Sequence, residues 1–219
     1  WIYLHNHRAE EAEALFKKYE NSTADWVLRL KFSIEVLHGH PNRAMKEFID
    51  QLKENKVSPP DWINTIEDML EVIPSEVLSS HIIEAVKYID RNADNLGRIG
   101  SILIDTGYHQ EAAVVLEKAL DIDAYDIYSW QDLARCYLLL QNMPKCQEAC
   151  DFGLAIDKNN PLLCIIKGYI LHEDMKFDEC IPYLQKARSF AEGKVNMRNV
   201  GLTAKDIHLQ ANVTYELLG

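Results

Sequence analysis

Two cysteines have a spacing that suits metal ligands. Cys146 and Cys150 are four residues apart, so a helix would present both thiols on one face, where a zinc ion could be bound. No pair of histidines shares that face. Both cysteines also fall at positions of a sequence repeat where small or apolar residues pack between helices. We therefore expect thiols in a helical core, and neither a metal site nor a cofactor.

Histidines occur in two closely spaced pairs. His5 and His7, like His38 and His40, are two residues apart, and a helix would point the members of such a pair away from each other. His38 and His40 flank Gly39 in an expected turn; a weak metal site is one reading, and a solvated turn is the one we favour. The chain has no phosphate-binding glycine loop, nucleophile elbow or zinc-protease motif. We expect a protein that is not an enzyme and has no catalytic residue.

The elements that position these residues come from a repeat with a period of 34 residues. The five units that align without a gap are residues 25–58, 59–92, 93–126, 127–160 and 161–194. Small or apolar side chains recur at position 20 of the units, which holds Ala44, Leu78, Ala112, Cys146 and Cys180. Such side chains recur one helical turn later at position 24, which holds Phe48, Ile82, Leu116, Cys150 and Leu184. A fixed period with this pattern predicts an all-α solenoid.

Each unit is expected to contain two helices, at about positions 1–14 and 17–30. The last position of four units holds a residue that favours a helix N-cap, namely Ser58, Asn92, Asp126 and Asn160. Gly39 and Gly107 fall between the two helices of their units, where a left-handed turn residue is useful. Both signals place the helix boundaries independently of the apolar pattern.

The two ends of the chain depart from the period. Residues 1–22 are expected to supply only the second helix of a partial repeat, and residues 203–219 the first helix of a further one. We expect one solenoid over residues 1–219 that is a piece of a longer protein.

Composition limits the possible partners and the compartment. The 219 residues are 47% hydrophobic, as in folded domains, and the net charge of −11 disfavours binding to nucleic acid. We find no apolar run long enough for a membrane helix and expect no direct membrane insertion. Five cysteines at core positions favour a reducing compartment, either the cytoplasm or the nucleus.

The repeat resembles the tetratricopeptide repeat, a family of right-handed α-solenoids. The unit at 127–160 carries this resemblance best, with Trp130, Leu133, Ala134 and Tyr137 at family positions 4, 7, 8 and 11. The other units keep fewer of the family residues, and the family proline at position 32 is absent from all five. The shared phase covers nearly the whole chain. The resemblance implies a protein-binding scaffold whose first helices line a concave groove.

Family geometry places positions 2, 5, 6, 9, 12 and 13 of each unit in that groove. In the last two full units these positions are rich in apolar and aromatic side chains, which suit the anchoring of a partner. The predicted partner-binding residues are Tyr128, Gln131, Arg135, Leu138, Leu139, Leu162, Ile165, Ile166, Tyr169 and His172. The alternative is that they contact an adjacent helix, such as 203–218, or a segment outside this sequence.

A secondary groove is expected in the first three units, at Arg29, Asn64, Arg98 and Ile104. The resemblance allows a comparison with the clamp that some family members use to hold the C-terminal carboxylate of chaperones. Starting at residue 25, the clamp positions hold Arg29, Ser33, Asn64, Asp94 and Arg98. Asp94 would repel a carboxylate, so the match is only partial.

The sequence thus predicts an interaction scaffold that binds a helical or extended protein segment, as a subunit or adaptor of a multiprotein complex. An apolar or basic segment is the expected partner. The alternatives are a co-chaperone that binds chaperone C-terminal peptides, a non-catalytic region of a larger enzyme, and a structural subunit whose repeats only pack inside an assembly.

Overall fold

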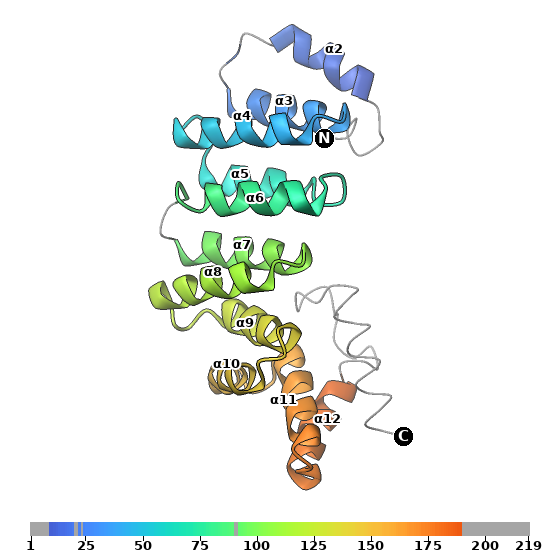
Figure 1. Cartoon of the computed structure of the whole chain (residues 1–219), viewed down its shortest axis with the longest axis vertical. Coiled ribbons are helices and arrows are strands. Elements are labelled where there is room, and N and C mark those ends of the chain that lie inside the picture. Colours follow the sequence, from blue (N-terminus) through green and yellow to red (C-terminus); the bar gives the residue numbers. More distant parts are fainter. Residues whose placement is uncertain (1–8, 20–21, 23, 90–91, 190–219) are drawn as a thin grey trace. The chain divides into compact units, whose positions relative to one another are not determined.

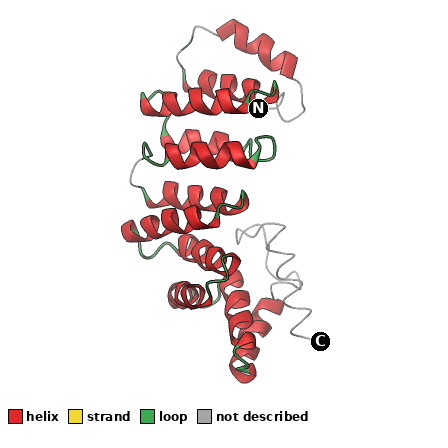
Figure 2. Cartoon of the chain, viewed as in Figure 1, coloured by secondary structure: helices red, strands yellow, loops and turns green. Residues whose placement is uncertain are grey.

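The computed structural model describes residues 9–19, 22, 24–89 and 92–189. Within these ranges the chain consists of helices joined by turns, with no strand (Figure 2). The chain divides into two compact units, Trp1–Ile122 and Asp123–Gly219. We call these two halves unit 1 and unit 2 and describe each by itself, and the 34-residue segments are called repeats from here on. The segment at 203–219, expected to begin a further repeat, lies outside the described residues.

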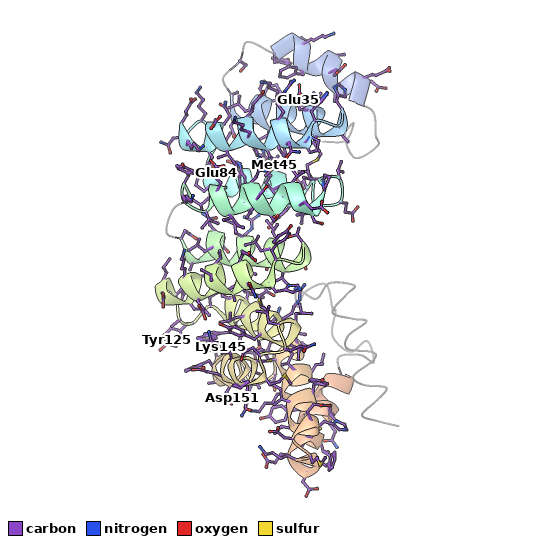
Figure 3. All side chains as sticks on the ribbon, viewed as in Figure 1. Glu35, Met45, Glu84, Tyr125, Lys145 and Asp151 are labelled. Atoms are coloured by element: carbon purple, nitrogen blue, oxygen red, sulfur yellow. The ribbon has the colours of Figure 1, made fainter. Side chains whose placement is uncertain are left out.

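Unit 1 contains seven helices in the described residues (Figure 1). They are α2 (Ala9–Tyr19), α3 (Asp25–Leu37), α4 (Pro41–Lys53), α5 (Pro59–Glu67), α6 (Ser75–Ala85), α7 (Ala93–Asp105) and α8 (His109–Ile122). The first helices of successive repeats, α3, α5 and α7, contact one another in sequence. The second helices α4 and α6 pack together in a parallel layer, and Met45 is fully buried where they meet (Figure 3).

Unit 2 contains four helices within residues 123–189. They are α9 (Ile127–Leu139), α10 (Met143–Ile156), α11 (Pro161–Glu173) and α12 (Phe177–Ser189). Helices α9 and α10 form one pair, α11 and α12 form the next, and α11 also packs on α9 and α10. The all-α prediction is therefore confirmed, with successive helix pairs packed as in tetratricopeptide solenoids.

The predicted N-caps are confirmed at all four positions. The side chains of Ser58, Asn92, Asp126 and Asn160 each accept a hydrogen bond from a backbone N–H in the first turn of the following helix. In the case of Asn160 the donor is the backbone N–H of Leu163, at 3.1 Å. These bonds satisfy N–H groups that have no partner inside the helix, and they fix where each first helix begins.

The turn between the two helices of a repeat has a left-handed residue at position 15 in four of the five repeats. Gly39 and Gly107 have φ of 82° and 89°, as their type predicts. Gln141 and Met175 occupy the same position of the last two repeats with φ of 55° and 57°. The second repeat differs because α5 ends at Glu67, well before the expected boundary, and a longer turn leads to α6.

Aromatic rings form the core between the first two full repeats. Phe32 of α3 stacks on Phe48 of α4 with ring centroids 4.4 Å apart, and Phe48 lies 5.9 Å from Trp62 of α5. All three rings are buried. Since aromatic pairs contribute beyond their buried area, this row joins one repeat to the next.

Candidate functional site

The cysteines of the chain are free and buried. The thiol of Cys146 donates to the carbonyl oxygen of Ala134 at 3.3 Å, and that of Cys150 donates to the carbonyl oxygen of Leu163 at 3.2 Å. Burial raises the pKa of Cys146 to about 12 and also raises the pKa of Cys150. A thiol with a raised pKa is a poor metal ligand, because metals bind the thiolate. In the described residues no three His, Cys, Asp or Glu side chains gather in a way that could hold a metal ion.

The second histidine pair lies beside carboxylates on the surface of unit 1. His38 Nε2 is 3.1 Å from Glu13 of α2, and His40 Nδ1 is 3.6 Å from Glu35 of α3. The two side chains thus reach different partners. His5 and His7 lie outside the described residues.

The ten residues predicted to line the groove of unit 2 all lie on α9 and α11, which pack against each other. Tyr128 is 61% exposed and Leu139 is 41% exposed, at the two ends of α9. Leu138, Tyr169 and His172 are half-buried. The remaining five are buried in the chain, and they are Gln131, Arg135, Leu162, Ile165 and Ile166.

Polar contacts hold the buried part of this surface in place. Gln131 Oε1 accepts a hydrogen bond from Asn160 Nδ2 at 3.0 Å, which ties α9 to the cap of α11. Asp132 Oδ1 lies 3.7 Å from Arg135 Nη1, and both side chains are largely buried. A buried charge is stable only with a partner, so these residues have a structural role that the sequence pattern did not separate from binding.

We call the accessible part the Tyr128 surface, and it consists of Tyr128, Leu138, Leu139, Tyr169 and His172. Tyr128 and Leu139 lie on one face of α9, because a separation of eleven residues is just over three turns of helix. Tyrosine and leucine supply apolar contact area, and tyrosine loses little conformational entropy when it is fixed by a partner. The surface therefore suits an apolar segment of a protein.

Sequence reasoning missed exposed apolar residues beyond this surface. Phe177, the first residue of α12, and Met175 in the turn before it are exposed, and the Phe177 ring lies edge-on to the His172 ring with centroids 5.5 Å apart. In unit 1, Trp26 of α3 is 46% exposed and meets Tyr19 of α2 in an edge-on contact at 5.2 Å. Trp26 occupies groove position 2 of its repeat, so the signal was present in the sequence.

The structure places the secondary groove residues on α3, α5 and α7 of unit 1. Arg98 Nη2 donates to Asn64 Oδ1 at 2.6 Å, and Arg98 Nε donates to Glu67 Oε1 at 3.1 Å. The hydrogen bond to Glu67 raises the pKa of the Arg98 guanidinium. Arg29 contacts α5 through other residues, Thr65 and Asp61. Ile104 is buried, so it does not contribute to an open surface.

Arg29 is held by two side chains of α5. Its Nε donates to Thr65 Oγ1 at 2.8 Å and its Nη1 to Asp61 Oδ1 at 3.2 Å. Ser33, another of the five clamp positions, is fully buried, and its hydroxyl donates a hydrogen bond to the backbone carbonyl oxygen of Arg29. Both arginines of the partial clamp match are thus already paired with carboxylates, which disfavours capture of a partner's C-terminal carboxylate.

Comparisons with known proteins agree with this geometry. The family model of the tetratricopeptide repeat matches residues 93–126, the range of helices α7 and α8. No curated protein matches the sequence. The crystal structure of MamA is 19% identical, with a TM-score of 0.52, and the alignment covers 74% of this chain and 95% of that chain.

Two further solved structures have similar scores. The C-terminal part of a TPR repeat-containing protein from Cytophaga hutchinsonii is 15% identical, with a TM-score of 0.55 over 88% of this chain and 78% of that chain. YrrB, described as a TPR protein with an unusual peptide-binding site, is 13% identical, with a TM-score of 0.54 over 80% of this chain and 91% of that chain. At such identities the likeness shows the fold alone. The segment at 93–126 is thus a tetratricopeptide repeat, and the likeness to these structures shows that the chain has the same kind of fold.

This fold supports a role as a protein-interaction scaffold. Members of the family are generally non-catalytic interaction modules. In the ranges that the structure describes, we find no helix with the length and apolar character needed to cross a membrane.

Proposed function

We propose that the protein is a non-catalytic scaffold that binds an apolar helical or extended segment of another protein on the Tyr128 surface of unit 2. The exposure of Tyr128 and Leu139 on one face of α9 carries this proposal. Large apolar side chains that remain exposed beside a buried core are common at interaction sites. The protein would act as an adaptor or subunit of a multiprotein complex in the cytoplasm or nucleus, where its free thiols stay reduced.

The buried half of the predicted groove supports the surface from below. Because a side chain that is at most 5% exposed offers almost no contact area, Ile166 and Arg135 are assigned to the structure of unit 2 and not to partner contact. Replacing Ile166 by alanine would remove buried methyl groups, at a cost of roughly 2–5 kcal/mol in unfolding free energy. That substitution cannot distinguish lost binding from lost folding.

The test therefore uses exposed residues. Wild-type protein and a variant with Tyr128→Ala and Leu139→Ala are used to purify partners from cell extract, and the bound proteins are compared by quantitative mass spectrometry. Tyr125→Ala is the matched control, because Tyr125 is 82% exposed and its side chain projects into solvent beside the start of α9 (Figure 3).

We expect at least one partner to be retained by the wild type and the control but lost from the double variant. Each such partner is then mixed in purified form with the three proteins to measure direct binding. Circular dichroism should show equal helicity for all three. Equal binding by the double variant and the wild type would contradict the proposal.

A further inference from the structure

A second exposed surface lies at the start of α3 in unit 1, far in sequence from the Tyr128 surface. Trp26 and Tyr19 form an aromatic pair there, with ring centroids 5.2 Å apart and exposed fractions of 46% and 40%. Tryptophan is the side chain most enriched at the energetic centres of protein interfaces, and it is the best aromatic partner for a cation. An exposed aromatic pair of this kind is a candidate anchor.

The charged groups of this region lie on α2, α3 and α5. Lys18 of α2 is one of them, and its Nζ lies 5.7 Å from the centroid of the Tyr19 ring. Asp25 precedes Trp26 directly, and Arg29, one turn along the same helix, is bonded to Asp61 of α5. Asp25 Oδ2 lies 3.8 Å from the same arginine, so two carboxylates share one guanidinium. The surface formed by Tyr19, Asp25, Trp26 and Asp61 is called the Trp26 surface.

The same excess of negative charge continues along α5 and α7. Arg98 is paired with Glu67, while Asp94, one turn before Arg98, adds a further negative charge. Three cations, those of Lys18, Arg29 and Arg98, are therefore outnumbered by four carboxylates, those of Asp25, Asp61, Glu67 and Asp94. An approaching acidic segment would meet net repulsion here, and a basic one would meet net attraction.

The carboxylate of Asp25 gives independent evidence of this imbalance. Its Oδ1 is buried and has no hydrogen-bond donor among the described residues, although the side chain as a whole is 37% exposed. Burial, and then repulsion from Asp61, raise the pKa of Asp25, while Arg29 lowers it. The unpaired oxygen and the raised pKa both indicate that Arg29 compensates the negative charge of Asp25 only in part.

We propose that the Trp26 surface binds a basic segment of a partner protein, with an arginine or lysine side chain lying on the Trp26 ring and its charge facing Asp25 and Asp61. The aromatic ring supplies apolar contact and attraction for the cation, and the carboxylates supply charge complementarity. The partner on this surface differs in chemistry from the apolar segment on unit 2, so one surface can fail without the other.

The probe is a fluorescent peptide of four Arg-Gly repeats, and binding to the whole chain is measured by fluorescence anisotropy. A peptide of four Glu-Gly repeats tests charge, and a peptide of four Leu-Gly repeats tests whether the surface is merely apolar. The variants are Trp26→Leu, which keeps an apolar side chain but removes the ring, and Asp25→Asn, which keeps the shape but removes the charge. The controls are Tyr125→Ala for an exposed aromatic ring and Glu71→Gln for an exposed carboxylate elsewhere.

We expect the Arg-Gly peptide to bind and the other two peptides not to bind. Each of the two variants should weaken binding of the Arg-Gly peptide by about threefold or more, and added salt should weaken it in the wild type. The controls should bind like the wild type. The inference is wrong if Trp26→Leu and Asp25→Asn bind the Arg-Gly peptide as tightly as the wild type, since general acidity would then explain the binding. It is also wrong if the Arg-Gly peptide does not bind, or if the Glu-Gly or Leu-Gly peptide binds equally well.

Discussion

Leu116 of α8 packs directly against Gly100 of α7. A Cβ added at Gly100 would lie 2.5 Å from both Cγ and Cδ2 of Leu116. The same pair of repeat positions meets again in unit 2, where a Cβ at Gly168 would lie 2.8 Å from Leu184 Cδ2. The missing side chain at position 8 is thus what allows the two helices of these repeats to approach closely.

We expect Gly100→Ala to destabilise the protein by about 1–3 kcal/mol, because Leu116 must leave its position to admit the new methyl group. The cost should exceed any gain from the higher helix propensity of alanine, which is about 1 kcal/mol. The measurement is chemical unfolding followed by circular dichroism. In a Leu116→Ala background the same glycine substitution should cost much less, and equal costs in both backgrounds would exclude the proposed clash.

The left-handed residues at position 15 lead to a prediction of opposite sign. Gln141 and Met175 have positive φ at the position that Gly39 and Gly107 occupy in other repeats. This conformation destabilises a residue that has a side chain by roughly 1–2 kcal/mol, and glycine avoids that strain. Glycine also raises the conformational entropy of the unfolded chain, which offsets part of the gain. We expect Gln141→Gly and Met175→Gly each to raise the unfolding free energy by about 0.5–1 kcal/mol.

Thermal and urea unfolding of the two variants measure this gain. Gln141→Ala and Met175→Ala are the matched controls, since they shorten the side chain but keep the Cβ that causes the strain. If alanine stabilises as much as glycine, backbone strain is not the cause.

The features that could be predicted from the sequence are those set by neighbouring residues. The caps at Asn92 and Asn160 follow from the side-chain type and from its position just before an apolar helix. The turn at Gly39 follows in the same way. The positive φ of Gln141 cannot be predicted from its residue type, and only the repeat position that it shares with Gly39 and Gly107 points to it.

Burial of the predicted groove could not be read from the sequence. Tyr128 and Ile165 both occupy groove positions of their repeats, yet Tyr128 is exposed and Ile165 is buried. Whether an apolar side chain at such a position stays open depends on what else packs against it, which the 34-residue pattern does not encode. For the same reason the pairing of Arg29 with Asp61 was missed, because it joins side chains of two different repeats.

The thiols should be unreactive in the folded protein. Burial raises the pKa of Cys146 to about 12 and that of Cys164 to about 11, so at pH 8 the folded state contains almost no thiolate at these residues. We expect modification by an aromatic disulfide reagent to follow unfolding. All five cysteines should react within minutes in concentrated denaturant and far more slowly without it. Rapid labelling of Cys146 in native buffer, identified by peptide mass spectrometry, would contradict the buried position.

The raised pKa of Asp25 predicts how stability varies with pH. Burial is the largest cause, repulsion from Asp61 adds to it, and Arg29 opposes both. Because the folded state holds this proton more tightly than the unfolded state, the stabilisation from protonation is fully present below the unfolded pKa of about 3.9. It is lost as the pH rises through the higher folded pKa.

Asp25→Asn cannot gain a charge, so its stability relative to the wild type should increase as the pH rises from about 3 through the raised folded pKa of Asp25, and should then stay constant. Urea unfolding of both proteins at a series of pH values measures this difference. Raising the salt concentration to about 0.5 M should reduce the contribution of Asp61, which acts through charge, more than that of burial. A difference that does not vary with pH would show that the Asp25 carboxylate has the same proton affinity in the folded and unfolded states. A difference that falls with rising pH would show that Arg29 outweighs burial and Asp61.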